Sequence, residues 1–165
     1  MSTRSRVSRV AQPPADDFGI LLTAALGVFK SQLHAHLARA GFDDLGPSFG
    51  FVFRSLADRP LSLVELAARL AITSQGALKI VAEMEERGYV ERTDDVVDRR
   101  VRRLSLTGRG RAALREARRF HASVEHELVV AVGSRQVAGA RAALTALAQK
   151  GVTDSTPLAA LARPF

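Results

Sequence analysis

The feature that most constrains the fold is a change in hydrophobic period at Gly88. Before this glycine, residues 62–70 and 74–87 carry apolar side chains every three or four positions, as amphipathic helices do. After it, residues 89–93 and 101–106 alternate apolar and polar side chains, which predicts two β-strands, and the charged residues between them predict a hairpin loop. The sequence therefore predicts two short helices followed by a β-hairpin.

The ends of the two short helices carry clear signals. Ser62 and Glu65 match a capping box, in which both side chains satisfy backbone donors at a helix start. Thr73 is a second capping residue, and Gly88 suits the position just after a helix. Only residues 71–73 separate the helices, and two short helices joined by such a tight turn make a helix-turn-helix.

Further helices are predicted on both sides of this unit. Residues 16–40 carry a long apolar stripe at helical spacing, and a shorter helix fits residues 48–57. After the hairpin, residues 107–133 and 136–150 fit two more helices. The predicted fold class is mainly α with a small β-hairpin wing, a winged helix-turn-helix flanked by N- and C-terminal helices.

The formal net charge of +7 is concentrated in two places. Residues 87–119 hold eleven arginines and five acidic residues, and the first ten residues hold three more arginines. A dense run of arginine indicates a polyanionic partner, because each neutralised phosphate releases counterions. A solvated charged surface is the alternative explanation.

The chain has no cysteine, which excludes disulfides, thiolate zinc sites and thiol redox sensing. No stretch approaches the ~18 uninterrupted apolar residues of a membrane span, and the arginine-rich N-terminus lacks the apolar segment of a signal peptide. We expect a soluble, cytoplasmic protein with no membrane partner.

Four stretches of the sequence form a set of related motifs. They are Leu-Ala-Ala-Arg-Leu at 66–70, Thr-Ser-Gln at 73–75, Met-Glu-Glu-Arg-Gly-Tyr-Val-Glu-Arg at 84–92, and Asp-Arg-Arg with an alternating strand that ends in Leu-Thr at 98–107. Together they resemble the MarR family of bacterial regulators. The resemblance implies a homodimeric regulator of transcription that binds double-stranded DNA, usually as a repressor, and not an enzyme or a cofactor-dependent protein.

A winged unit of about 60 residues cannot bury the apolar stripes of the flanking helices, so we expect these to meet a second copy across a two-fold axis. Such a dimer would read a pseudo-palindrome with half-sites about 34 Å or ~10 bp apart. The expected regions are a disordered basic arm (1–15), a helical dimerisation region (16–45 with 107–150), a winged helix-turn-helix DNA-binding domain (46–106) and a tail (151–165).

The second short helix is predicted to read bases in the major groove, because a helix of this size fits there and its N-terminus favours phosphate. One apolar face should be buried, which turns the opposite face outward. Two positions depart from expectation, since Leu78 stands where the family usually has Ser or Thr, and Gly76 weakens the first helical turn. The buried face is Ala77, Ile80, Val81 and Met84, and the candidate contact residues are Thr73, Ser74, Gln75, Leu78 and Lys79.

The wing is predicted to contact DNA through Asp98, Arg99, Arg100 and Arg102, with Arg99 or Arg100 in the minor groove. By the resemblance, Asp98 and Arg100 occupy the paired Asp and Arg of the family's wing motif. An arginine here suits a narrow minor groove, and Asp98 could orient it through a bidentate pair. The alternative is a surface ion pair of little energetic weight.

The resemblance also implies that a small aromatic or phenolic ligand releases the DNA after binding between the dimer helices and the winged unit. Phenylalanines in such positions are more often ordinary core residues, which is the alternative explanation. The candidate pocket residues are Phe29, Gln32, Leu33, His36, Phe49 and Phe53.

Other functions are also considered. A winged dimer that docks protein without reading bases is the chief alternative. Ser48 lies in a G-x-S-x-G motif, but a hydrolase elbow needs a preceding strand, and this serine is better explained as a helix-start residue. His121 and Glu125 have a spacing that could share a metal, yet no third ligand accompanies them, so no metal site is predicted.

Overall fold

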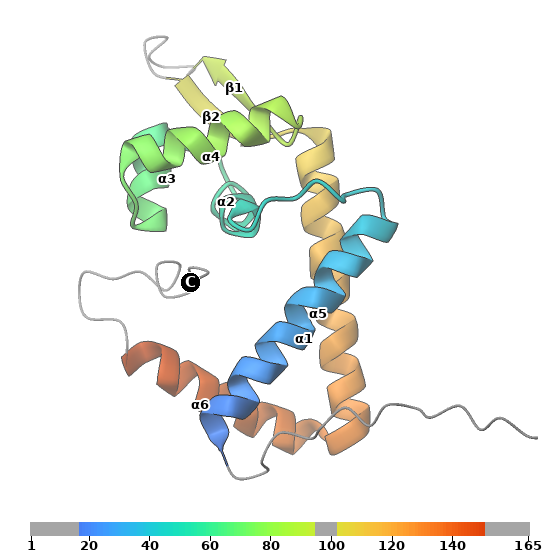
Figure 1. Ribbon diagram of the computed structural model, residues 1–165. Helices are drawn as coiled ribbons and strands as arrows, with labels where there is room; N and C mark the ends of the chain where they lie inside the picture. Colours follow the sequence, from blue (N-terminus) through green and yellow to red (C-terminus); the bar gives the residue numbers. More distant parts are fainter. Residues whose placement is uncertain (1–16, 95–101, 151–165) are drawn as a thin grey trace, which may run out of the picture.

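The computed structural model describes residues 17–94 and 102–150 (Figure 1). The predicted basic arm, the tip of the wing and the tail lie outside these residues. In the described part the prediction of a mainly helical chain with one hairpin is confirmed. The elements are α1 (Phe18–Arg39), α2 (Phe49–Ser55), α3 (Leu63–Leu70), α4 (Ser74–Glu86), β1 (Val90–Asp94), β2 (Arg102–Leu106), α5 (Gly108–Val132) and α6 (Ser134–Lys150).

The winged module, which we define as residues 49–106, packs three helices against the hairpin. Helix α3 contacts both α2 and α4, while β1 packs on α4 and β2 on α3. The strands are antiparallel, with Val90 opposite Leu106. Leu61, just before α3, exchanges two backbone hydrogen bonds with Leu104 of β2, at 3.1 and 2.7 Å. The hydrophobic period did not predict this additional bridge, because it involves one residue only.

The winged module has its own hydrophobic core. Tyr89, Phe49, Leu66, Val81 and Met84 have at most 1% of their surface exposed. Burial of each such side chain is worth roughly 1.5–3 kcal/mol, so this cluster fixes the position of α4 and the hairpin.

The predicted helix ends are confirmed by their capping contacts. Ser62 Oγ accepts from the Glu65 amide at 3.2 Å and Glu65 Oε2 accepts from the Ser62 amide at 2.7 Å, which completes the capping box. Thr73 Oγ1 accepts from the Gly76 amide at 3.1 Å. Gly88 follows α4 with a φ of +70°, a conformation that glycine adopts without strain. Local chemistry therefore sets where the two helices of the helix-turn-helix begin and end.

Helix α5 starts in close contact with the winged module. Thr107 Oγ1 accepts from the Gly110 amide at 3.0 Å and donates to the Gly88 carbonyl at 2.6 Å. A Cβ on Gly110 would lie only 2.2 Å from the carbonyl oxygen of Tyr89, so no side chain fits there. Gly110 therefore allows the close approach of α5 to the segment that follows α4.

The helical region, which we define as α1, α5 and α6, extends away from the winged module (Figure 1). The ring of Phe120 in α5 lies 5.3 Å from that of Phe29 and 5.5 Å from that of His36, both in α1. Helix α6 packs on α5, where Arg141 pairs with Glu125 at 2.6 Å.

The predicted apolar stripe of α1 is mostly exposed in the single chain. Leu37 is its one buried residue, whereas Val28 is 56% exposed. Among the described helices, α1 is also the one that is long and apolar enough to cross a bilayer by those two criteria alone. Its packing on α5 and its exposed apolar side chains equally fit a helix that is covered by a second protein surface.

Candidate nucleic-acid interface

Helix α4 presents the face that the sequence predicted. Ala77, Val81 and Met84 are buried in the core, and Ile80 is half-buried at its edge. The candidate contact residues Thr73, Ser74, Gln75, Leu78 and Lys79 are all exposed. Because they lie on the N-terminal half of α4, they share one surface with the positive end of the helix dipole.

The two unusual residues of α4 have different local explanations. A Cβ on Gly76 would lie 3.3 Å from Thr73 Oγ1, which is tight against the capping hydroxyl. Gly76 thus leaves room for the cap that starts the helix. Leu78 is 42% exposed, and nothing in the fold of the single chain explains an outward leucine there.

Several arginines of the basic stretch are engaged within the protein. Arg87 pairs with Glu83 at 2.7 Å and Arg92 with Glu85 at 3.0 Å, so these two help to fix the C-terminal half of α4. By contrast, Lys79 has no ion-pair partner among residues 17–94 and 102–150. The net charge of the stretch therefore overstates how many cations are available to a polyanion.

The described part of the wing consists of its two strands. Arg102 Nε lies 3.2 Å from Asp94 Oδ1, and both side chains are more than half exposed. Such a pair contributes little to stability and leaves the guanidinium accessible. Asp98, Arg99 and Arg100 lie outside the described residues, and their predicted contacts stay predictions.

Glu65 links the start of α3 to the wing. Besides its capping bonds, its carboxylate accepts from Arg103 of β2 at 2.6 Å and from Arg59 at 3.2 Å. Hydrogen bonds from Ser62, then from Arg59, with the charge of Arg103, lower the pKa of Glu65 to about 2. The sequence indicated the cap but not the link to Arg103, because no local pattern joins residues 38 positions apart.

The six residues predicted to line a ligand pocket fall into two groups, and their role in ligand binding stays a prediction. Phe49 and Phe53 are at most 3% exposed and pack around Tyr89, so the alternative explanation as core residues holds for both. Phe29 and His36 pack on Phe120 instead, and Leu33 is half-buried while Gln32 is exposed.

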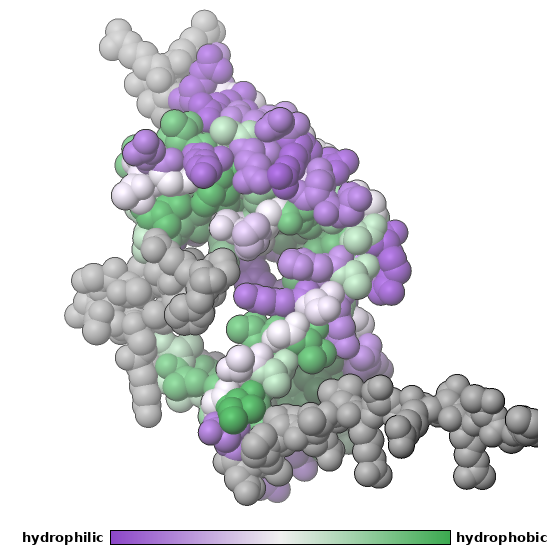
Figure 2. All heavy atoms as spheres, in the orientation of Figure 1, coloured by the Kyte–Doolittle hydropathy of each residue, from purple (hydrophilic) through white to green (hydrophobic). Residues whose placement is uncertain are grey.

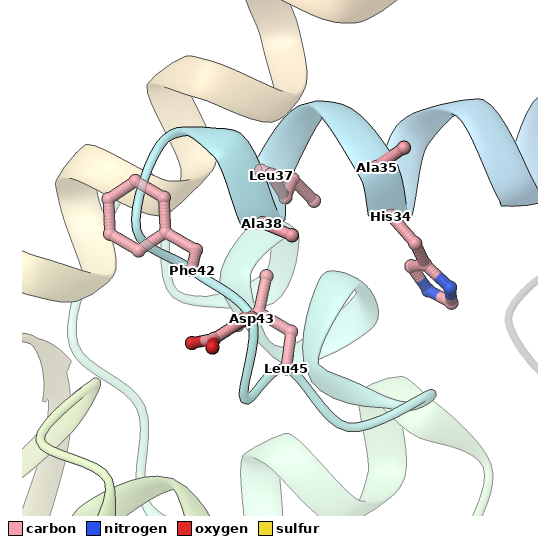
Figure 3. A pocket seen from close by; sticks show the side chains of 7 residues that line it. All are labelled: His34, Ala35, Leu37, Ala38, Phe42, Asp43 and Leu45. Carbon is pink, nitrogen blue, oxygen red and sulfur yellow. The ribbon is translucent and has the colours of Figure 1, made fainter.

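A pocket of about 330 Å³ lies nearby, between the end of α1 and the segment that leads to α2 (Figure 3). His34 and Asp43 face it from opposite sides, with apolar side chains between them. Its lining residues are His34, Ala35, Leu37, Ala38, Phe42, Asp43 and Leu45. Sequence reasoning missed this pocket because it depends on how the α1–α2 connection turns.

The alternative sites do not assemble in the described residues. No group of three or more potential metal ligands occurs there, and Glu125 is engaged by Arg141. Burial, together with the charge of Arg54, lowers the pKa of His121. Ser48 is the N-cap residue of α2 and follows a loop, not a strand.

A helix-turn-helix with a β-hairpin packed on it defines a winged helix-turn-helix protein. The family model described as MarR family matches residues 51–101. This match covers most of the winged module and agrees with the resemblance of its motifs to the MarR family, which consists of transcription regulators. No curated protein matches the sequence significantly.

Solved structures share the fold over most of the chain. FabT of Streptococcus pneumoniae in complex with DNA is 23% identical, with a TM-score of 0.64, over 81% of this chain and 96% of that one. RV1404 of Mycobacterium tuberculosis is 22% identical, with a TM-score of 0.67, over 87% and 98%. MepR of S. aureus bound to ethidium bromide is 18% identical, with a TM-score of 0.61, over 81% and 96%. At these identities the likeness establishes the fold.

Proposed function

We propose that the protein is a homodimeric, sequence-specific DNA-binding regulator that represses transcription from a pseudo-palindromic operator. The observation that carries this proposal is the exposed N-terminal face of α4, with Ser74, Gln75, Leu78 and Lys79 on one surface. Such a face can enter the major groove, where Gln75 could read an adenine and Lys79 could meet a phosphate. DNA is also what the FabT structure contains.

A second copy would supply both the second reading helix and cover for the helical region. Figure 2 shows hydrophilic residues over α4 and the hairpin, and hydrophobic residues at the surface along α1. One reading helix selects too few bases to define a genomic site, whereas two define a pseudo-palindrome. The most exposed large apolar residues of the helical region are Phe18, Leu26, Val28, Val130 and Val132.

The wing completes the proposal. Arg99 and Arg100, with Asp98 beside them in sequence, are assigned to the minor groove, and Arg102 to the adjacent backbone. In each dimer the two wings would then flank the two reading helices. This arrangement gives the arginines of the wing a polyanionic partner.

Binding to random duplex DNA, followed by selection of the bound sequences, tests the proposal. We expect a two-fold related motif and an affinity that falls steeply with salt. Lys79→Ala and Arg100→Ala should each reduce the salt slope by about one phosphate contact. Lys30→Ala is the matched control, because Lys30 lies on α1, away from α4 and the wing.

Unchanged binding in both Lys79→Ala and Arg100→Ala would contradict the assignment of α4 and the wing. Absence of binding to any duplex would instead favour a winged dimer that docks protein. A dimer mass in solution is required in either case.

We also propose that a small aromatic molecule weakens DNA binding, since MepR is known with ethidium and a pocket adjoins α1. Of the residues first assigned to ligand binding, Phe29, Gln32, Leu33 and His36 remain available. Thermal-shift screening with aromatic anions should find compounds that stabilise the protein and weaken its binding to DNA. A screen without any such compound would contradict this part of the proposal.

A further inference from the structure

Three connecting segments of the fold meet at the side chain of Asp44, which lies between α1 and α2. The hydroxyl of Tyr89, between α4 and β1, donates to Asp44 Oδ1. Arg109, in the first turn of α5, donates to the same oxygen at 3.0 Å and to the Tyr89 hydroxyl at 3.0 Å. Arg87, which caps the C-terminus of α4, donates to the Asp44 carbonyl. The exits of α1 and α4 and the entry to α5 are thus tied to one residue.

The tyrosine of this junction, which consists of Asp44, Tyr89 and Arg109, is part of the core. Tyr89 is fully buried, and its ring makes edge contacts with Phe49 and Phe53 at 6.0 and 5.6 Å. The Arg109 guanidinium lies 4.7 Å from the Tyr89 ring centre and 5.9 Å from that of Phe42. Stacking and hydrogen bonding together favour this arrangement of the side chains.

The charge states suit a permanent contact at neutral pH. Burial alone would raise the pKa of Asp44, but hydrogen bonds from Tyr89 and Arg109 outweigh it and lower the pKa below its ordinary value. Burial and the hydrogen bond to Asp44 raise the pKa of Tyr89. The carboxylate therefore remains an acceptor and the phenol remains a donor.

The junction lies between the helical region and the winged module, so it can affect how the two are oriented. On one side lie α1 and α5, which would carry the contacts to a second copy. On the other side lies α4, which would enter the major groove. A rotation of the winged module against α1 and α5 would disturb the hydrogen bonds that join Asp44 to Tyr89 and Arg109. In a dimer, the orientation of the winged module would set the separation of the two α4 helices.

We propose that Asp44, Tyr89 and Arg109 are positioning residues that set the half-site spacing accepted by the dimer. This inference rests on the proposed function, since it concerns how two reading helices are held apart. The three residues act through the orientation of the winged module and not through contacts with bases.

The test compares operators that differ only in spacing. The selected operator and derivatives with one or two base pairs inserted or removed between the half-sites are titrated with the full chain and with Tyr89→Phe and Asp44→Asn. Tyr89→Phe keeps the buried ring and removes only the hydroxyl, so it remains informative if Asp44→Asn does not fold. Glu85→Gln is the matched control, because its pair with Arg92 lies within the winged module.

The unaltered chain should prefer its own spacing by about tenfold or more, as expected when one half-site is misplaced. Tyr89→Phe and Asp44→Asn should reduce this preference to within about threefold, with the dimer mass and the binding to random DNA unchanged. Glu85→Gln should keep the full preference.

A purely structural role would lower the melting temperature and all affinities together while the spacing preference persisted, and that result would overturn the inference. If the unaltered chain bound no duplex, the result would contradict both the proposed function and this inference. If the unaltered chain preferred one half-site spacing and both variants kept the same preference, the result would contradict only the inference.

Discussion

The winged module and the helical region differ in how completely a single chain buries their apolar residues. In the winged module Leu66, Val81 and Met84 are fully buried against their own neighbours. In the helical region Val28, Leu128 and Val130 remain about half exposed or more. A single chain therefore completes the core of the winged module, whereas much of the apolar surface of the helical region stays exposed.

The largest expected effect tests the contact between the two regions. Gly110→Ala places a methyl group 2.2 Å from the Tyr89 carbonyl oxygen, where backbone must move. Overpacking of this kind should lower the free energy of unfolding by about 3 kcal/mol, measured by urea denaturation.

Gly139→Ala is the matched control, because a Cβ there meets nothing within 4 Å on exposed α6. It should leave stability unchanged or raise it by up to about 1 kcal/mol through better helix propensity. Equal effects of the two substitutions would show that α5 does not approach the winged module this closely.

The next largest effect should appear in the helical region and in assembly. Val28→Asp places a charge on the exposed stripe of α1, and loss of one buried apolar contact costs about 2 kcal/mol. We expect the dimer dissociation constant to rise about 30-fold, which analytical ultracentrifugation can measure.

Val64→Asp provides the comparison, since Val64 is 68% exposed on α3 of the winged module. That variant should dimerise normally. A dimer insensitive to Val28→Asp but weakened by Val64→Asp would reverse the contrast between the two regions.

Local signals in the sequence were enough to predict the elements of the winged module. The caps at Ser62 and Thr73 and the alternation in the strands are local, so they predicted α3, α4 and the hairpin to within about two residues of the observed ends. The exposed face of α4 followed from its apolar face by periodicity alone.

Interactions between distant residues were beyond such reasoning. Asp44 and Arg109 are 65 positions apart, and no spacing rule connects them. The division of the expected pocket residues into two groups was also not predictable, because Phe49 and Phe53 pack on Tyr89 whereas Phe29 packs on Phe120. An aromatic residue at helical spacing does not show which neighbour it will meet.

A smaller, pH-dependent effect is expected at Glu65. Its pKa in the folded protein is about 2, below the ordinary value of 4.5, so ionised Glu65 favours folding at neutral pH. This contribution should be complete above the ordinary pKa and be lost as the pH falls toward 2. Melting temperatures recorded from pH 6 to pH 2 should therefore fall less steeply for Glu65→Gln than for the unaltered chain, and parallel curves would contradict the assignment.

The smallest effect on stability is expected at the wing, where Arg102 pairs with Asp94 on the surface. Arg102→Ala should change the free energy of unfolding by no more than about 0.5 kcal/mol, because exposed ion pairs contribute little. If Arg102 meets the DNA backbone as proposed, the same variant should reduce the salt slope of operator binding by about one. A change in stability without a change in the salt slope would make Arg102 part of the scaffold of the wing. A change in the salt slope without a change in stability would place Arg102 in the DNA interface, where it contributes to binding and not to folding.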